Sequence, residues 1–148
     1  MRKTIAAILG LLLLSCAKEA EVLSDFQEFT EISQNISNNR VNAFVQDGEG
    51  CVWIATDRGV NRYNGYDYHC WYHTDNPSSL CDNQVKAIAV DNDGNVWCGT
   101  INGVCRYTDK DDFKTVPVGG STFIRNIFLT PGGNLVVCTI NSIEVLEK

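Results

Sequence analysis

Apolar and polar residues alternate in short runs after residue 40. Val41, Ala43 and Val45 occupy every second position of residues 41–46, and Asp47-Gly48-Glu49-Gly50 then supplies turn residues. Further strands are predicted at 52–56, 60–63 and 66–71, separated by Arg58-Gly59 and by the strong hairpin signal Asn64-Gly65. This segment therefore predicts a small sheet of four antiparallel strands.

The same pattern returns at a constant offset of 44 residues. Residues 36–63 and 80–107 align without gaps, and 12 of the 28 aligned positions are identical. The second copy predicts strands at 85–90, 96–100, 104–107 and 113–116. A third copy at 124–146, offset by 39, keeps the apolar spacing but has Val136, Thr130 and Ser142 in place of the repeated Trp, Asp and Gly.

Four short antiparallel strands in about 40 residues is the size of one β-propeller blade. We therefore predict an all-β fold: a partial β-propeller of about three four-stranded blades, with units near 36–72, 80–117 and 120–148. A closed propeller typically has about four to eight blades, so this ring is incomplete. The leading interpretation is the N-terminal portion of a longer protein; self-association into a ring and an open array covered by partners are the alternatives.

The first residues resemble an export signal. Arg2 and Lys3 precede an apolar run of signal-peptide length from Ile5 to Leu14, which is too short for a transmembrane helix of about 20 residues. The sequence Leu13-Leu14-Ser15-Cys16 resembles the bacterial lipobox, which implies cleavage after residue 15 and lipidation of Cys16. An ordinary signal peptide is the alternative.

The predicted organisation is thus a signal peptide at 1–15, a polar tether at 16–25 and the partial propeller at 26–148. Residues 26–30, Phe26-Gln27-Glu28-Phe29-Thr30, match the place of an outer fourth strand. The predicted location is the cell envelope, at a membrane reached through the lipid anchor.

Charge argues against nucleic acid as a partner. The chain has 12 basic and 18 acidic residues, and losing Arg2 and Lys3 with the signal peptide changes the net charge from −6 to −8. Binding nucleic acid depends on neutralising phosphates with Lys and Arg, so no nucleic-acid interface is predicted.

Cysteine spacing gives no metal motif. No CxxC pair occurs, and neither His69 nor His73 accompanies a cysteine pair at zinc-ligand spacing. Buried thiols and disulfides both remain open for the cysteines other than Cys16, which are Cys51, Cys70, Cys81, Cys98, Cys105 and Cys138. No metal, cofactor or catalytic residue is predicted.

The repeated pattern V-x-A-[IF]-x-x-D-x-x-G-x-V-W-x-[GA]-T-x-x-G-V-x-R-Y resembles the two-component regulator propeller repeat, found in periplasmic sensor regions of hybrid two-component systems of Bacteroidetes. Residues that recur in register are expected to be structural: the Trp residues pack between blades and the Asp residues cap turns. This blade signature comprises Asp47, Gly50, Trp53, Thr56 and Gly59, and then Asp91, Gly94, Trp97, Thr100 and Gly103.

An aromatic cluster at residues 66–73 does not repeat. Aromatic residues with polar tips can stack on sugar rings, which makes Tyr68, Trp71 and Tyr72 candidate ligand contacts; a half-buried outer strand is the competing interpretation. The family resemblance implies a non-enzymatic sensor module that responds to glycan-type ligands, with any histidine kinase elsewhere. The alternatives are an adaptor lipoprotein that binds another envelope protein, and a propeller hydrolase or lyase, whose converging acid, base or metal ligands are not found.

Overall fold

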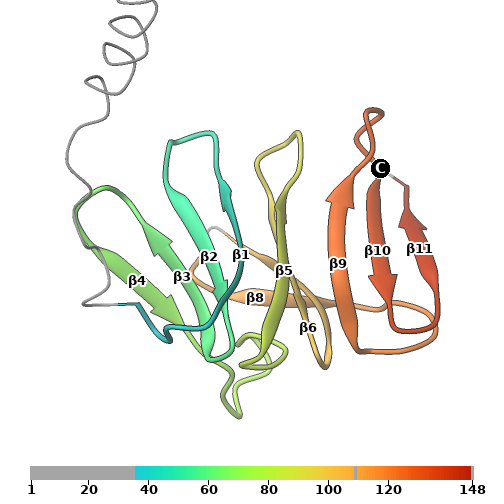
Figure 1. The fold of residues 1–148 in the computed structure, drawn as a ribbon, viewed down its shortest axis with the longest axis horizontal. Coiled ribbons are helices and arrows are strands. Elements are labelled where there is room, and N and C mark those ends of the chain that lie inside the picture. The colour runs from blue at the N-terminus through green and yellow to red at the C-terminus, as the bar shows by residue number, and fades with distance from the viewer. Residues whose placement is uncertain (1–35, 109, 148) are drawn as a thin grey trace, which may run out of the picture. The chain divides into compact units, whose positions relative to one another are not determined.

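The computed structural model describes residues 36–108 and 110–147. The predicted signal peptide, Cys16, the tether and the strand at 26–30 lie outside these residues. Within them, all regular structure is β, with eleven strands in three antiparallel sheets that lie side by side in chain order (Figure 1). No helix in this part of the chain is long and apolar enough to cross a membrane.

The first blade has the strand order β1-β2-β3-β4. Its strands are β1 (Val41–Gln46), β2 (Val52–Thr56), β3 (Gly59–Tyr63) and β4 (Tyr68–Trp71). Strand β4 begins two residues later than predicted, because the Asn64 side chain extends the preceding turn: its Oδ1 accepts the backbone N–H of Tyr66 at 2.9 Å and of Asp67 at 2.8 Å.

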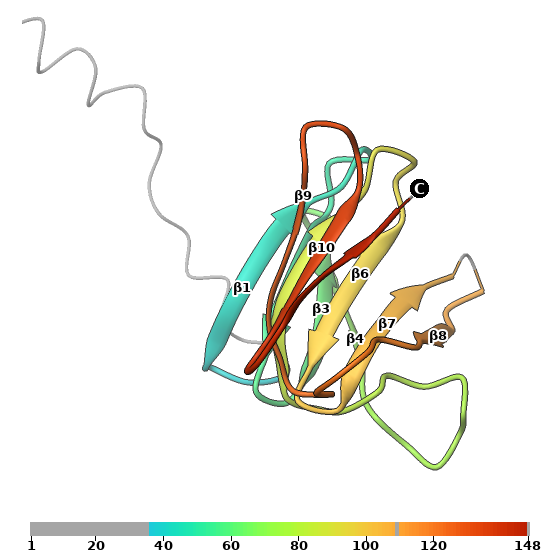
Figure 2. The same ribbon diagram turned by 90° about the vertical axis from the view of Figure 1, so that its right-hand side faces the viewer.

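The second and third blades repeat this meander. Their strands are β5 (Val85–Val90), β6 (Val96–Thr100), β7 (Gly103–Tyr107) and β8 (Phe113–Val116), and then β9 (Ile124–Leu129), β10 (Leu135–Thr139) and β11 (Ile143–Leu146). The described part of the third blade holds three strands, in the order β9-β10-β11. Figure 2 brings this blade to the front. The prediction of a partial propeller is confirmed.

Two apolar seams join neighbouring blades. We call the side of a blade that packs on the preceding blade its N-side face, and the opposite side its C-side face. In the first seam, the C-side face of blade 1 meets the N-side face of blade 2; in the second, blade 2 meets blade 3 in the same way. The seams contain Trp53, Ala55, Val60, Val85, Ile88 and Val96, and then Ala87, Ala89, Val104, Ile124, Ile127 and Leu135.

The two outermost faces carry the same kinds of residues without a neighbour among the described residues. Phe44 is 74% exposed, whereas Ile88, which is equivalent in blade 2, is 7% exposed. On the last C-side face, Ile143 is 73% exposed, whereas its equivalent Val104 is fully buried. Both ends of the array are therefore shaped as blade interfaces.

Candidate ligand-binding site at the rim between the first two blades

The repeated Asp and Trp lock the β1–β2 turn. Asp47 Oδ1 accepts the backbone N–H of Glu49 at 3.0 Å and of Cys51 at 2.9 Å, and Oδ2 accepts the indole N–H of Trp53 at 2.8 Å. The guanidinium of Arg62 lies over the Trp53 ring, 5.6 Å from its centroid. Burial by itself raises the pKa of Asp47, but these hydrogen bonds and the Arg62 charge outweigh it and hold the pKa below the usual 3.8.

The second blade repeats this lock. Asp91 accepts the backbone N–H groups of Asp93 and Asn95, both at 2.9 Å, and the indole N–H of Trp97 at 2.9 Å. Arg106 lies 5.8 Å from the centroid of Trp97. In the third blade, Thr130 Oγ1 accepts the N–H of Asn134 at 3.1 Å, so a hydroxyl takes over part of the role of the carboxylate.

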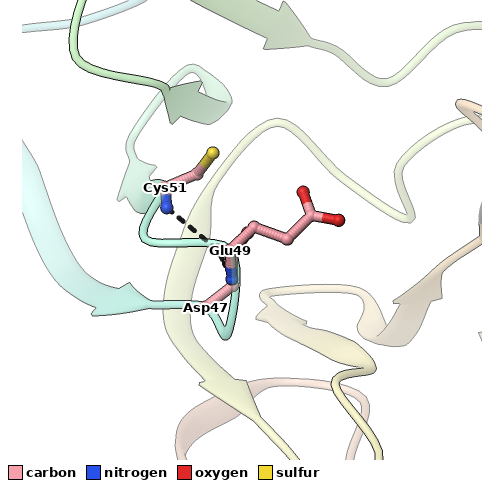
Figure 3. A group of neighbouring side chains, drawn as sticks. All are labelled: Asp47, Glu49 and Cys51. Carbon is pink, nitrogen blue, oxygen red and sulfur yellow. Dashed lines mark hydrogen bonds between the residues drawn. The ribbon is translucent and has the colours of Figure 1, made fainter.

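Acidic and thiol groups also gather at the first turn. Ligand atoms of Asp47, Glu49 and Cys51 lie within 4.8 Å of one another (Figure 3). The Asp47 oxygens already accept three N–H groups, and the Glu49 carboxylate pairs with the Arg62 guanidinium. The cluster is therefore explained by the structure of the turn.

An aromatic stack joins the outer parts of blades 1 and 2. Trp53, which is 1% exposed, stacks on Trp71 of β4 with ring centroids 5.2 Å apart and planes 14° apart. Tyr107 of β7 meets Trp53 edge-on at 4.8 Å and Trp71 at 5.2 Å. Phe113 of β8 extends the stack, 6.1 Å from Trp71. The stack fixes β4 of one blade against β7 and β8 of the next.

A pocket of about 350 Å³ opens beside this stack, at the rim between the two blades. We call it the rim pocket. Its aromatic lining comes from Tyr68, His69, Trp71 and Tyr107, and its polar lining from Arg62, Asn64, Asp67 and Asp111. Its volume is at the lower end of the range for small-molecule sites, about 300–1,000 Å³.

Some polar groups of the rim pocket already form hydrogen bonds within the described part of the protein, and others do not. The Tyr107 hydroxyl donates to Asp111 Oδ1 at 2.6 Å, which joins the β7–β8 turn to the stack. The indole nitrogen of Trp71 is buried and has no hydrogen-bond partner among the described residues. Flat aromatic surfaces beside carboxylates offer both contacts that a sugar ring makes, an apolar face and hydroxyl donors at its edge.

The structure places the three predicted ligand contacts at two different sites. Tyr68 and Trp71 line the rim pocket, but Tyr72 does not: it packs at the β2–β3 turn, where a Cβ added to Gly59 would lie 3.0 Å from Tyr72 Cδ1. His73 Nδ1 lies 2.6 Å from the carbonyl oxygen of Leu80 and so helps hold the connector between the blades.

Six of the eight residues that line the rim pocket were not among the predicted ligand contacts, and two of these six, Tyr107 and Asp111, come from blade 2. Tyr107 repeats Tyr63 and therefore looked structural, and Asp111 belongs to a turn that does not recur in sequence. A larger pocket of about 540 Å³ lies nearby and is lined mainly by polar loop residues, such as Ser78 and Lys110. The rim pocket is the stronger candidate because it brings aromatic side chains from two blades together.

Comparison with known proteins supports the assignment of the repeat. Residues 35–58 and 79–102 match the family model described as "Two component regulator propeller", which confirms the resemblance in the first two units. No curated protein matches the chain at a significant level.

Solved structures show the same fold. The extracellular domain of a hybrid two-component system from B. thetaiotaomicron superposes with a TM-score of 0.71 at 24% identity, over 81% of this chain and 18% of that chain. PorZ, a surface component of the type-IX secretion system of Porphyromonas gingivalis, gives 0.60 at 20% identity, over 80% and 19% of the two chains. Virginiamycin B lyase from Staphylococcus aureus gives 0.61 at 18% identity, over 76% and 40%.

These comparisons establish a propeller fold whose first two units match the two-component regulator propeller model. The chain spans less than a fifth of the length of the B. thetaiotaomicron structure. At identities below 25%, the likeness to all three structures concerns the fold alone.

Proposed function

We propose that this chain, whose first two blades are two-component regulator propeller repeats, is part of the ligand-binding region of an envelope two-component sensor. It performs no catalysis of its own, and the histidine kinase belongs to another part of the protein. The ligand is a glycan fragment, bound in the rim pocket. The family match supports the sensor role.

The rim pocket is the observation that carries this proposal. Its aromatic residues come from both blades, and three of its polar residues, Asp67, Asp111 and Asn64, offer oxygen acceptors for hydroxyl groups. A ligand in this pocket contacts β4 of blade 1 and the β7–β8 turn of blade 2 at once. Ligand binding would therefore favour one relative position of the two blades, which is what a sensor needs in order to pass on a signal.

The exposed end faces support membership of a larger ring. Val41 and Phe44 are exposed, although their equivalents in blades 2 and 3 are buried against a neighbouring blade. We propose that further blades of the sensor cover both ends. Sedimentation analysis tests this: a chain that is monomeric and does not aggregate at high concentration would argue against it.

We further propose that the protein is exported and anchored through a lipid on Cys16, on the basis of the lipobox-like sequence. Several acyl chains together give stable anchoring, because each buried methylene contributes about 0.8 kcal/mol. Mass spectrometry of the mature N-terminus from native membranes tests this point. An unmodified Cys16 would contradict it.

The ligand is tested by calorimetry of the complete sensor against a panel of oligosaccharides. Tyr68→Ala should weaken binding at least tenfold, which corresponds to about 1.4 kcal/mol. Tyr72→Ala is the matched control, because Tyr72 lies outside the rim pocket and should leave the affinity unchanged. Thermal melting of both variants separates loss of binding from loss of fold.

Two outcomes would contradict the proposal. If no oligosaccharide binds the intact sensor, the glycan assignment is wrong. If a stoichiometric envelope protein is recovered with the chain and no small ligand binds, the adaptor role replaces the sensor role.

A further inference from the structure

Three thiols gather on the N-side face of blade 2. Cys98 of β6 and Cys105 of β7 are cross-strand partners, and Thr115 of β8 is the partner of Cys105 on its other side. Cys81, in the connector between blades 1 and 2, places its Sγ 3.6 Å from Thr115 Oγ1. Cys98 and Cys105 are fully buried and Cys81 is 8% exposed, so the connector thiol closes over this row.

The equivalent residues of blade 1 show how the connector is held against the sheet there. Ser37 and Asn61 occupy the places of Cys81 and Cys105, 44 residues earlier in the chain. There, the backbone N–H of Ser37 donates to Asn61 Oδ1 at 2.7 Å, and the Cys70 thiol donates to the same oxygen at 3.0 Å. The segment that enters blade 1 is thus fastened to strand β3 by a partly buried polar contact.

We propose that Cys81 and Cys105 form a disulfide in the exported protein, which fastens blade 2 covalently where blade 1 uses a hydrogen bond. None of the six described cysteines forms a disulfide in this structure. The bond therefore depends on an oxidant of the disulfide class, as expected for a protein that folds outside the cytoplasm.

The reaction is thiol–disulfide exchange. The Cys81 thiolate attacks one sulfur of the oxidant's disulfide and displaces the other as a thiolate, which leaves a mixed disulfide on Cys81. The Cys105 thiolate then attacks the Cys81 sulfur and releases the second thiol of the oxidant. The two protein thiols lose two protons and two electrons, and the oxidant is reduced to a dithiol or to two thiols.

Geometry favours Cys81 over Cys98 as the partner of Cys105. Directly opposed residues on neighbouring antiparallel strands have Cβ atoms about 4.5–5.5 Å apart, whereas a disulfide holds them about 3.8 Å apart. The hydrogen-bonded ladder fixes the separation of Cys98 and Cys105. Cys81 lies outside the strands, so the connector can adjust to the shorter distance.

Burial restricts when the bond can form. The neighbouring Cys105 thiol and burial raise the pKa of Cys81. The Cys81 thiol by itself lowers the pKa of Cys105, but the Cys98 thiol and burial outweigh it, so that this pKa is raised as well. Because the thiolate is the attacking species, exchange is slow in the packed blade, and the bond forms during folding.

The test is to refold the full chain with oxidised glutathione, alkylate the remaining thiols in denaturant and map the peptides. We expect five of the seven cysteines to be alkylated and one peptide pair to link Cys81 to Cys105. Cys81→Ala should abolish the link, and Cys138→Ala, which removes a thiol of the third blade, should retain it. Seven alkylated cysteines, or a link from Cys105 to Cys98, would overturn the proposal.

A second measurement does not depend on peptide mapping. Closing a loop of about 25 residues should raise the melting temperature of the oxidised protein by on the order of 10 °C over that of the reduced protein. The double variant Cys81→Ser, Cys105→Asn recreates the pair found in blade 1. It should fold and melt at the same temperature under both conditions. Equal melting of the oxidised and reduced unaltered chain would refute the bond, whatever ligand the propeller binds.

Discussion

The hydrogen bond between the Trp53 indole and Asp47 can be weighed by a double-mutant cycle. Trp53→Phe removes the N–H donor and part of a fully buried ring. A residual cavity on the order of 40 Å³ costs about 1 kcal/mol, at about 24 cal/mol per Å³. Loss of a hydrogen bond to a charged acceptor adds about 1.5–2 kcal/mol. The free energy of unfolding should therefore fall by about 3 kcal/mol.

The second blade provides a matched control. Trp97 donates to Asp91 in the same way, but its ring is only partly buried and Asn95 Nδ2 also donates to Asp91 Oδ2, at 2.8 Å. Water can fill the space left by Trp97→Phe, so only the hydrogen-bond contribution remains. We expect this variant to cost about 1.5 kcal/mol, roughly half the cost of Trp53→Phe.

Urea unfolding of the full chain, followed by far-ultraviolet circular dichroism, measures these costs without depending on indole fluorescence. Combining Trp53→Phe with Asp47→Asn should give a coupling free energy of about 1.5 kcal/mol, because each single variant already breaks the shared bond. Equal costs for the two Trp variants, or a coupling below about 0.5 kcal/mol, would refute the account of the turn lock.

Two further predictions concern packing and pH. Gly99→Ala should cost about 1–3 kcal/mol, because the added Cβ would lie 2.6 Å from Ile124 Cγ2 in the second seam; Gly48→Ala, with nothing within 4 Å, should be nearly neutral in the same urea assay. The lowered pKa values of Asp47 and Asp91 contribute stability that is present above their unfolded-state pKa, near 3.9, and is lost as the pH falls through the folded-state values. The urea concentration at the midpoint of unfolding should therefore decrease when the pH is lowered below about 4, and it should decrease less steeply in the Asp47→Asn, Asp91→Asn double variant. An equal decrease in the two proteins would show that other carboxylates are responsible.

Most strands were predictable because the chain contains two copies of one unit, which can be aligned with each other. A register shared by residues 36–63 and 80–107 distinguishes turn residues from strand residues more surely than either copy alone. Strands β5, β6 and β8 have the predicted bounds, and β7 begins one residue earlier, at Gly103. The start of β4 was missed because it depends on a side-chain acceptor, Asn64, that one-residue propensities do not describe.

The site was less predictable, since it is assembled from two blades. Sequence singled out Tyr68, Trp71 and Tyr72 because they lie close together in the chain, and the predicted strand at 66–71 did not show where each side chain would lie. Strand β4 ends at Trp71, so Tyr72 lies beyond the strand, beside Gly59 and outside the rim pocket. The contribution of Tyr107 and Asp111 depends on the first seam, which sets β7 beside β4.

The difference between the two faces of a blade gives the array a direction. A unit copied by duplication of about 44 codons arrives with an N-side face that fits its predecessor and a C-side face that fits its successor, so the chain can lengthen without new interfaces arising by mutation. What such copying does not supply is the spacing of each individual seam. Ala55, Gly99 and Cys138 occupy one equivalent position with three different side-chain sizes. In the second seam the position is Gly99, and because a larger side chain there would meet Ile124, the spacing of that seam depends on a substitution of its own.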